Sequence, residues 1–209
     1  MYDALFFDLD GTLIDTESLA LTSGLAAFAA AGVPVTESFL HSLIGTDEPT
    51  AASRIRLHLP EVDLQAVNRL WKSGFMALVD LGLELKPGVR DLFAALSHLP
   101  RALVTSSGRV SAQHKLGLVG LGSDFAAVVA LEDVTRPKPA PDPYLLAARL
   151  LGVSPARCLV FEDSEPGAEA AHRAGCTVVQ VPDMVPATGR WAHHIAPDLL
   201  SGARLAGLL

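Results

Sequence analysis

The chain has 209 residues, half of them apolar, which suits one ordinary domain or a core domain with a smaller insert and predicts a large buried core. A net charge of −7 with only four lysines excludes general nucleic-acid binding, which needs a basic footprint, and 19% charged residues exclude a disordered chain. No basic segment precedes the first apolar run, and Asp8 and Asp10 interrupt that run too early for a signal peptide or a membrane span, so we expect a cytoplasmic protein.

The first predicted element is a short apolar strand at residues 4–7, and a long helical segment follows it. This segment of some seventy residues contains no convincing strand. We predict helices at residues 16–31, 37–44, 48–58 and 64–81. A helical insert, residues 15–84, therefore emerges at the carboxyl end of the first strand. Ligands bind at that edge of open α/β sheets, so the insert is placed to act as a lid or cap.

The remainder of the chain alternates between helices and short apolar strands rich in Val, Leu and Phe. The predicted strands are residues 101–105, 126–131, 158–161 and 177–181. Helices at 87–100, 142–152 and 165–175 separate them, and a further helix is implied between 106 and 125. Because the strands are continuous apolar runs without alternation, they are expected to be buried on both faces. We predict a doubly wound, Rossmann-like parallel sheet formed by residues 1–14 and 85–209.

Two carboxylates stand at the end of the first strand in "FFDLDGT". Side chains alternate along a strand, so Asp8 and Asp10 point to the same side. Two carboxylates placed together repel each other, which favours either a bound cation or a shared proton. Gly11 allows the backbone to approach a ligand closely. The pattern indicates a site for chemistry at the strand end.

With this motif the sequence resembles the haloacid dehalogenase superfamily of aspartate-nucleophile phosphotransferases. The family's second motif, a hydroxyl residue ending an apolar strand, is matched by Thr105 in "ALVTSSG". Its lysine is matched by Lys138 in "RPKPAPDPY", although Pro137 stands where Gly is commoner. Its acidic pair is matched by Glu162 and Asp163 in "LVFEDSEPGAEAAHRAG". All four motifs occur in order, and the resemblance covers nearly the whole chain.

The resemblance implies phosphoryl transfer through an aspartyl-phosphate. Asp8 corresponds to the nucleophile, and Asp10 to the general acid that protonates the leaving alkoxide and then activates water as a base. The expected cofactor is Mg²⁺, which prefers oxygen ligands. Its implied ligands are the Asp8 carboxylate, the Asp10 backbone carbonyl and Asp163, with Glu162 beside or just behind them.

The phosphoryl group itself has its own implied partners. Thr105 corresponds to a hydroxyl that binds a phosphoryl oxygen, helped by the backbone N–H groups around Leu9 and Ser106. Lys138 corresponds to the cation that pairs with the phosphoryl oxygens and holds Asp8. Phosphoryl transfer depends mainly on such positioning and charge neutralisation.

The helical insert resembles the small cap of the subgroup that contains β-phosphoglucomutase, phosphoglycolate phosphatase and sugar phosphatases. True haloacid dehalogenases lack the second aspartate, so Asp10 argues for phosphate chemistry. The mutase has a cap histidine and a cap arginine where this chain has Ala20 and, approximately, Glu48. The missing cations favour a phosphatase, and the acidic loop favours a neutral sugar or polyol phosphate as substrate.

Five polar residues are candidates for setting substrate specificity. They are Glu17, Thr46, Asp47 and Lys72 in the insert and Arg109 after "TSSG". Each of them is also explained as an ordinary solvated side chain.

Three other functions remain open on the sequence. One is a sugar phosphomutase like β-phosphoglucomutase. Another is a phosphonoacetaldehyde-type hydrolase, which needs a cap lysine for a Schiff base, and Lys72 is the only candidate. The third is a non-catalytic binding protein that reuses the fold, although such a protein has no need for an acid/base carboxylate. We expect a small-molecule phosphate ester as partner, no nucleic acid or membrane, and a monomer or weak dimer.

Overall fold

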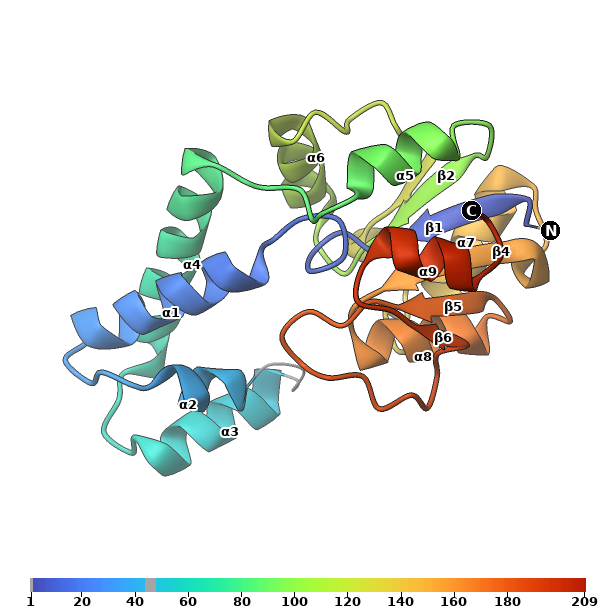
Figure 1. The fold of residues 1–209 in the computed structure, drawn as a ribbon. Helices are drawn as coiled ribbons and strands as arrows, with labels where there is room; N and C mark the ends of the chain where they lie inside the picture. Colours follow the sequence, from blue (N-terminus) through green and yellow to red (C-terminus); the bar gives the residue numbers. More distant parts are fainter. Residues whose placement is uncertain (1, 44–47) are drawn as a thin grey trace. The chain divides into compact units, whose positions relative to one another are not determined.

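The computed structural model describes residues 2–43 and 48–209 (Figure 1). The chain divides into two compact units, one formed by residues 1–15 with 84–209 and the other by residues 16–83. Over the part of the chain that is described, no helix is both long and apolar enough to cross a membrane.

The larger unit is built on one parallel sheet in the order β3-β2-β1-β4-β5-β6. Its strands are β1 (Ala4–Phe7), β2 (Arg101–Val104), β3 (Ala127–Val129), β4 (Cys158–Glu162), β5 (Thr177–Gln180) and β6 (His194–Ile195). The predicted doubly wound parallel sheet is therefore confirmed. The short edge strand β6 was not predicted, because two residues carry no recognisable apolar pattern.

Helices cover both faces of this sheet. They are α5 (Val89–Ala95), α6 (Arg109–Leu118), α7 (Asp142–Leu151), α8 (Glu165–Arg173) and α9 (Leu199–Leu205), with 3₁₀ turns η1 (Leu131–Asp133) and η2 (Pro155–Arg157). Helices α7 and α8 pack on the face that carries Phe6 and Val160. Helices α5 and α9 pack on the opposite face, where Phe93 meets Phe7 at 5.1 Å between ring centroids.

The central strand β1 brings three strand ends to one level. Phe7 pairs with Leu103 of β2 on one side and with Phe161 of β4 on the other. The rings of Phe7 and Phe161 stack at 5.1 Å, so the apolar ends of β1 and β4 are locked side by side. Polar residues that follow these strands therefore emerge together at the carboxyl edge of the sheet.

The smaller unit is entirely helical over its described residues. Its helices are α1 (Glu17–Ala30), α2 (Glu37–His41), α3 (Glu48–His58) and α4 (Leu64–Leu81). Helix α1 packs along α4, and Trp71 meets Phe28 edge-on at 6.0 Å. The indole nitrogen of Trp71 also donates to the carbonyl of Ala20 at 2.9 Å, so this tryptophan belongs to the core of the unit.

Candidate active site

Lys138 joins the ends of three strands. Its ammonium donates to Oδ1 of Asp8 at 2.6 Å, to the carbonyl of Val104 at 2.9 Å and to Oε1 of Glu162 at 2.5 Å. Asp8 follows β1, Val104 ends β2 and Glu162 ends β4. Because the side chain of Lys138 is only 4% exposed, its charge is balanced mainly by these buried partners. The structure thus brings together the residues that the sequence placed in the first, third and fourth motifs.

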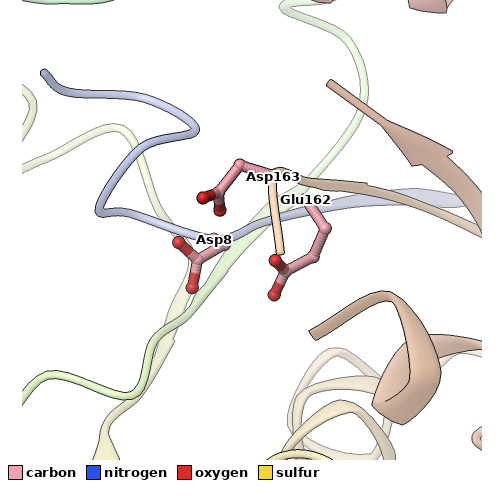
Figure 2. A group of neighbouring side chains, drawn as sticks. All are labelled: Asp8, Glu162 and Asp163. Atoms are coloured by element: carbon pink, nitrogen blue, oxygen red, sulfur yellow. The ribbon is translucent and has the colours of Figure 1, made fainter. Parts of the chain in front are cut away.

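Three carboxyl groups share this strand edge. Oxygen atoms of Asp8, Glu162 and Asp163 all lie within 4.8 Å of one another, and Figure 2 shows the three side chains gathered in one place. Carboxylate oxygens are the ligands that Mg²⁺ prefers. The donor set therefore fits a hard divalent cation by its chemistry.

Burial and mutual repulsion affect the ionisation of the acidic side chains Asp8 and Asp163. Burial raises the pKa of Asp8 to about 8; Lys138 opposes this rise, and Glu162 adds to it. Burial, followed by the charges of Glu162 and Asp8, also raises the pKa of Asp163 well above its ordinary value. Burial opposes the positive charge of Lys138, but Asp8 and Glu162 outweigh it and raise the pKa of Lys138. The site is therefore short of positive charge, which a divalent cation supplies.

Two glycines make the close approach of these acids possible. Gly11 has a φ of +81°, and a Cβ there would lie 2.5 Å from Oδ2 of Asp163. A Cβ on Gly167, in the first turn of α8, would lie 1.9 Å from Oε1 of Glu162. The neighbouring hydroxyl of Thr12 donates to Oδ1 of Asp163 at 3.1 Å. The loop after β1 is thus built around the carboxyl group of Asp163.

Glu162 has partners on both of its oxygens. Tyr144 of α7 donates from its hydroxyl to Oε1 at 2.8 Å, beside Lys138. Ser164 donates to Oε2 from its hydroxyl at 3.0 Å and from its backbone N–H at 3.3 Å. Because both carboxylate oxygens of Glu162 already accept hydrogen bonds, Glu162 is suited to holding Lys138 in place. Asp163 is more accessible than Glu162.

The predicted phosphate-binding residues lie at the same edge. Thr105 directly follows β2 and is 4% exposed, and its hydroxyl oxygen accepts a hydrogen bond from the N–H of Ser107 at 3.0 Å. That bond leaves the hydroxyl proton of Thr105 to be donated elsewhere. Leu9 has a buried side chain, so any contact it makes to phosphate comes from its backbone, and Ser106 is exposed. Their roles in binding phosphate stay predictions.

Asp10 faces a different set of partners from Asp8. Its Oδ1 accepts a hydrogen bond from Lys115 at 2.6 Å, and its Oδ2 accepts one from the hydroxyl of Ser107 at 2.6 Å. Lys115 comes from α6 and Ser107 from the loop before it. The second aspartate of the motif is therefore held by the segment that follows β2.

Lys115, Ser107 and Tyr144 were missed by the sequence analysis. A signal for Lys115 exists, because it shares the buried face of α6 with Ala112 and Leu116, where a lysine is unusual. Tyr144 is likewise fully buried on α7 and needs a partner for its hydroxyl. Neither pattern identifies the acid that each side chain meets.

The five specificity candidates have separate outcomes. Glu17 lines a cavity of about 320 Å³ in the helical unit, and Lys72 lines a neighbouring hollow of about 310 Å³. Arg109 pairs instead with Asp133 and donates weakly to the carbonyl of Val128 at 3.4 Å. These contacts explain Arg109 as part of the core unit's framework. The other two candidates, Thr46 and Asp47, lie outside the described residues.

Comparison with known proteins identifies the family of this chain. A sequence profile described as haloacid dehalogenase-like hydrolase matches residues 2–175. Fructose-1-phosphate phosphatase YqaB of Escherichia coli (strain K12) is 33% identical over 183 residues, covering 86% of this chain and 96% of that protein. Hexitol phosphatase A of the same organism is 35% identical over 181 residues, covering 84% of this chain and 81% of that protein.

A solved structure agrees with these sequence relatives. The HAD family hydrolase from Deinococcus radiodurans R1, with bound phosphate and sodium, is 27% identical and superposes with a TM-score of 0.84, covering 100% of this chain and 97% of that one. The profile match spans the four motifs that surround Asp8. The chain belongs to the haloacid dehalogenase-like hydrolase family.

Proposed function

We propose that the protein is a Mg²⁺-dependent phosphatase that hydrolyses a small sugar or polyol phosphate through an aspartyl-phosphate on Asp8. The observation that carries this proposal is the pairing of Asp8 with Lys138 at the end of β1, beside two further carboxyl groups. A carboxylate so placed is a nucleophile whose charge is balanced when an anionic phosphate approaches. The family and the phosphatase names of its relatives support the same reaction class.

The cation has a fitting set of ligands in this chain. Asp8 and Asp163 would hold it through carboxylate oxygens, with the backbone carbonyl of Asp10 as a third ligand, while Glu162 is committed to Lys138, Tyr144 and Ser164. When bound, Mg²⁺ would neutralise the nucleophile and the phosphate together.

The first chemical step forms the bond between Asp8 and phosphorus. An oxygen of the Asp8 carboxylate attacks phosphorus in line with the ester oxygen, and the bond from phosphorus to the alkoxide breaks. Asp10, in its protonated form, gives its proton to that alkoxide so that a neutral alcohol leaves. Lys138 and Thr105 bind the phosphoryl oxygens during the transfer.

The second step releases phosphate. Asp10 is now a carboxylate and takes a proton from a water molecule, whose oxygen attacks phosphorus. The bond between phosphorus and Asp8 breaks, and the Asp8 carboxylate is regenerated. In the structure the two oxygens of Asp10 accept hydrogen bonds from Ser107 and Lys115.

The helical unit and the relatives support the substrate class that we propose. A phosphomutase must hold a second phosphate, yet the position of its cap histidine is Ala20, whose side chain carries no positive charge. Relatives named for fructose 1-phosphate and hexitol phosphates support a neutral, hydroxyl-rich alcohol as the leaving group.

A phosphate-release screen tests the proposal. The purified protein is assayed with sugar, polyol and glycolate phosphates, with Mg²⁺ or with EDTA, and the Asp8→Asn variant is assayed in parallel. We expect turnover of a sugar or polyol phosphate that EDTA abolishes and that Asp8→Asn lacks. Release at the parental rate by Asp8→Asn would falsify the role of Asp8, and conversion of a sugar 1-phosphate to its 6-phosphate without release would favour the mutase.

A further inference from the structure

Lys115 carries its charge inside the core unit. Its side chain is 5% exposed, and it lies on the same face of α6 as the buried residues Ala112 and Leu116. A buried ammonium group is strongly unfavourable unless an anion and hydrogen-bond acceptors compensate for its lost hydration. A lysine at this position therefore depends on the groups that it reaches.

Among the described residues, those groups include the second aspartate of the motif and a serine. The ammonium of Lys115 lies 2.6 Å from Oδ1 of Asp10 and 3.2 Å from the hydroxyl oxygen of Ser107. The same hydroxyl donates to Oδ2 of Asp10 at 2.6 Å. Both oxygens of Asp10 are thus held, one by each donor, and this fixes the rotation of its carboxyl group.

The two buried lysines of the core unit divide the two aspartates between them. Lys138 contacts Asp8 and Glu162, whereas Lys115 contacts Asp10. In the proposed function Asp8 accepts the phosphoryl group and Asp10 transfers protons. Lys115 therefore acts on the proton-transferring carboxyl group, from a helix that contributes none of the motif residues.

We propose that Lys115 is a positioning residue that, together with Ser107, sets the orientation of the Asp10 carboxyl group for proton transfer. This inference rests on the proposed function of Asp10. Because Lys115 acts through Asp10, its loss is expected to slow the chemical step and to leave substrate binding nearly unchanged. We expect the fall in rate to be largest for substrates whose leaving alkoxide needs a proton.

The first test compares Lys115→Met with the parent enzyme. Methionine has a similar length and keeps the buried space filled, but it cannot donate to Asp10. For the best sugar or polyol phosphate of the screen we expect kcat to fall about 10- to 100-fold and KM to change less than about 2-fold. For p-nitrophenyl phosphate, whose leaving group departs without protonation, we expect the rate of the phosphorylation step in single-turnover assays to fall less than about 3-fold. Gln113→Met, on the exposed face of α6, should behave as the parent.

A double-mutant cycle isolates the route through Asp10. In an Asp10→Asn background, where proton transfer is already lost, Lys115→Met should cause no further loss in the single-turnover phosphorylation rate with the sugar or polyol phosphate. Lys115→Arg keeps the charge and the donors, and it should recover part of the sugar-phosphate kcat that methionine loses.

The opposite results overturn the proposal. One is an equal fall in rate with both substrate types. The other is the same fall in rate from Lys115→Met with and without Asp10→Asn. Either result would make Lys115 a structural residue only. If circular dichroism shows that Lys115→Met does not fold, Ser107→Ala replaces it in the same comparison and cycle, because it removes the other donor to Asp10. A parent enzyme that hydrolyses no phosphate ester would instead refute the proposed function, and this inference with it.

Discussion

Lys138 lies 2.6 Å from Oδ1 of Asp8, and only 4% of its side chain is exposed. This ion pair links the loop that precedes α7 to the end of β1. The same ammonium group lies 2.5 Å from Oε1 of Glu162. The buried ammonium group of Lys138 therefore joins two acids of the core unit, and in the proposed function it also binds the phosphoryl group.

Replacement of Lys138 should damage both stability and activity. Lys138→Met leaves Asp8 and Glu162 buried without their cation, and breaking such a pair costs about 3 kcal/mol in the free energy of unfolding at pH 7. Urea unfolding measures this loss, and phosphate release should disappear. Lys72→Met, at an exposed position of α4, should stay within about 0.5 kcal/mol of the parent. Similar stability of the two variants would contradict a stabilising role for the buried contacts of Lys138 with Asp8 and Glu162.

Asp10→Asn should separate substrates by their leaving groups. The amide cannot protonate an alkoxide, so we expect sugar phosphates to lose about 100-fold or more in kcat, while p-nitrophenyl phosphate loses much less in the phosphorylation step. Single-turnover assays with both substrates measure this step apart from the water attack that follows. Equal losses would count against the acid role of Asp10.

Gly11→Ala should be far more harmful than Gly175→Ala. Both positions have a positive φ, +81° and +84°, so both variants lose about 1 kcal/mol from backbone strain. Only at Gly11 does the new Cβ collide with Asp163, whereas nothing lies within 4 Å at Gly175. Thermal unfolding and Mg²⁺ titration compare the two variants. Comparable Mg²⁺ binding by both would argue against the close packing of Gly11 on Asp163.

Mg²⁺ should stabilise the folded protein through Asp163. A ligand that binds only the folded state raises the melting temperature, and the rise grows with its concentration. In Asp163→Asn most of this rise should vanish because one carboxylate ligand of the cluster is lost. Asp91→Asn, an exposed acid of α5, serves as the control. An unchanged Mg²⁺ shift in Asp163→Asn would place the cation elsewhere.

The Arg109–Asp133 pair should contribute to stability only above acidic pH. The hydrogen bond from Arg109 lowers the pKa of Asp133, against a smaller effect of burial, and the N–H of Ala130 adds to the lowering. Since the folded pKa lies below the unfolded one, the stabilisation is complete above about pH 4 and is lost as the pH falls through the folded pKa. Asp133→Asn should cost about 0.5 to 1 kcal/mol at pH 7 in urea unfolding, and less at pH 3.5. A constant difference at the two pH values would exclude this ion pair as its source.

Local patterns in the sequence determined the order of the elements and the motif positions. Continuous apolar runs such as residues 158–161 are typical of strands buried on both faces, and the structure has a parallel strand there, Cys158–Glu162. The same patterns set Asp8 and Asp163 just after strands. Because parallel strands end at one edge, their meeting follows from the sequence with little further information.

Only the tertiary structure decided which buried charges pair. Lys115 and Asp10 are separated by 105 positions and Tyr144 and Glu162 by 18, and no local periodicity links them. The helices that carry Lys115 and Tyr144 must first pack on the sheet before these side chains find their acids, and Arg109 is drawn to Asp133 in the same way. Short-range propensity shapes each segment of a chain, but the partners of buried polar groups depend on how distant segments pack.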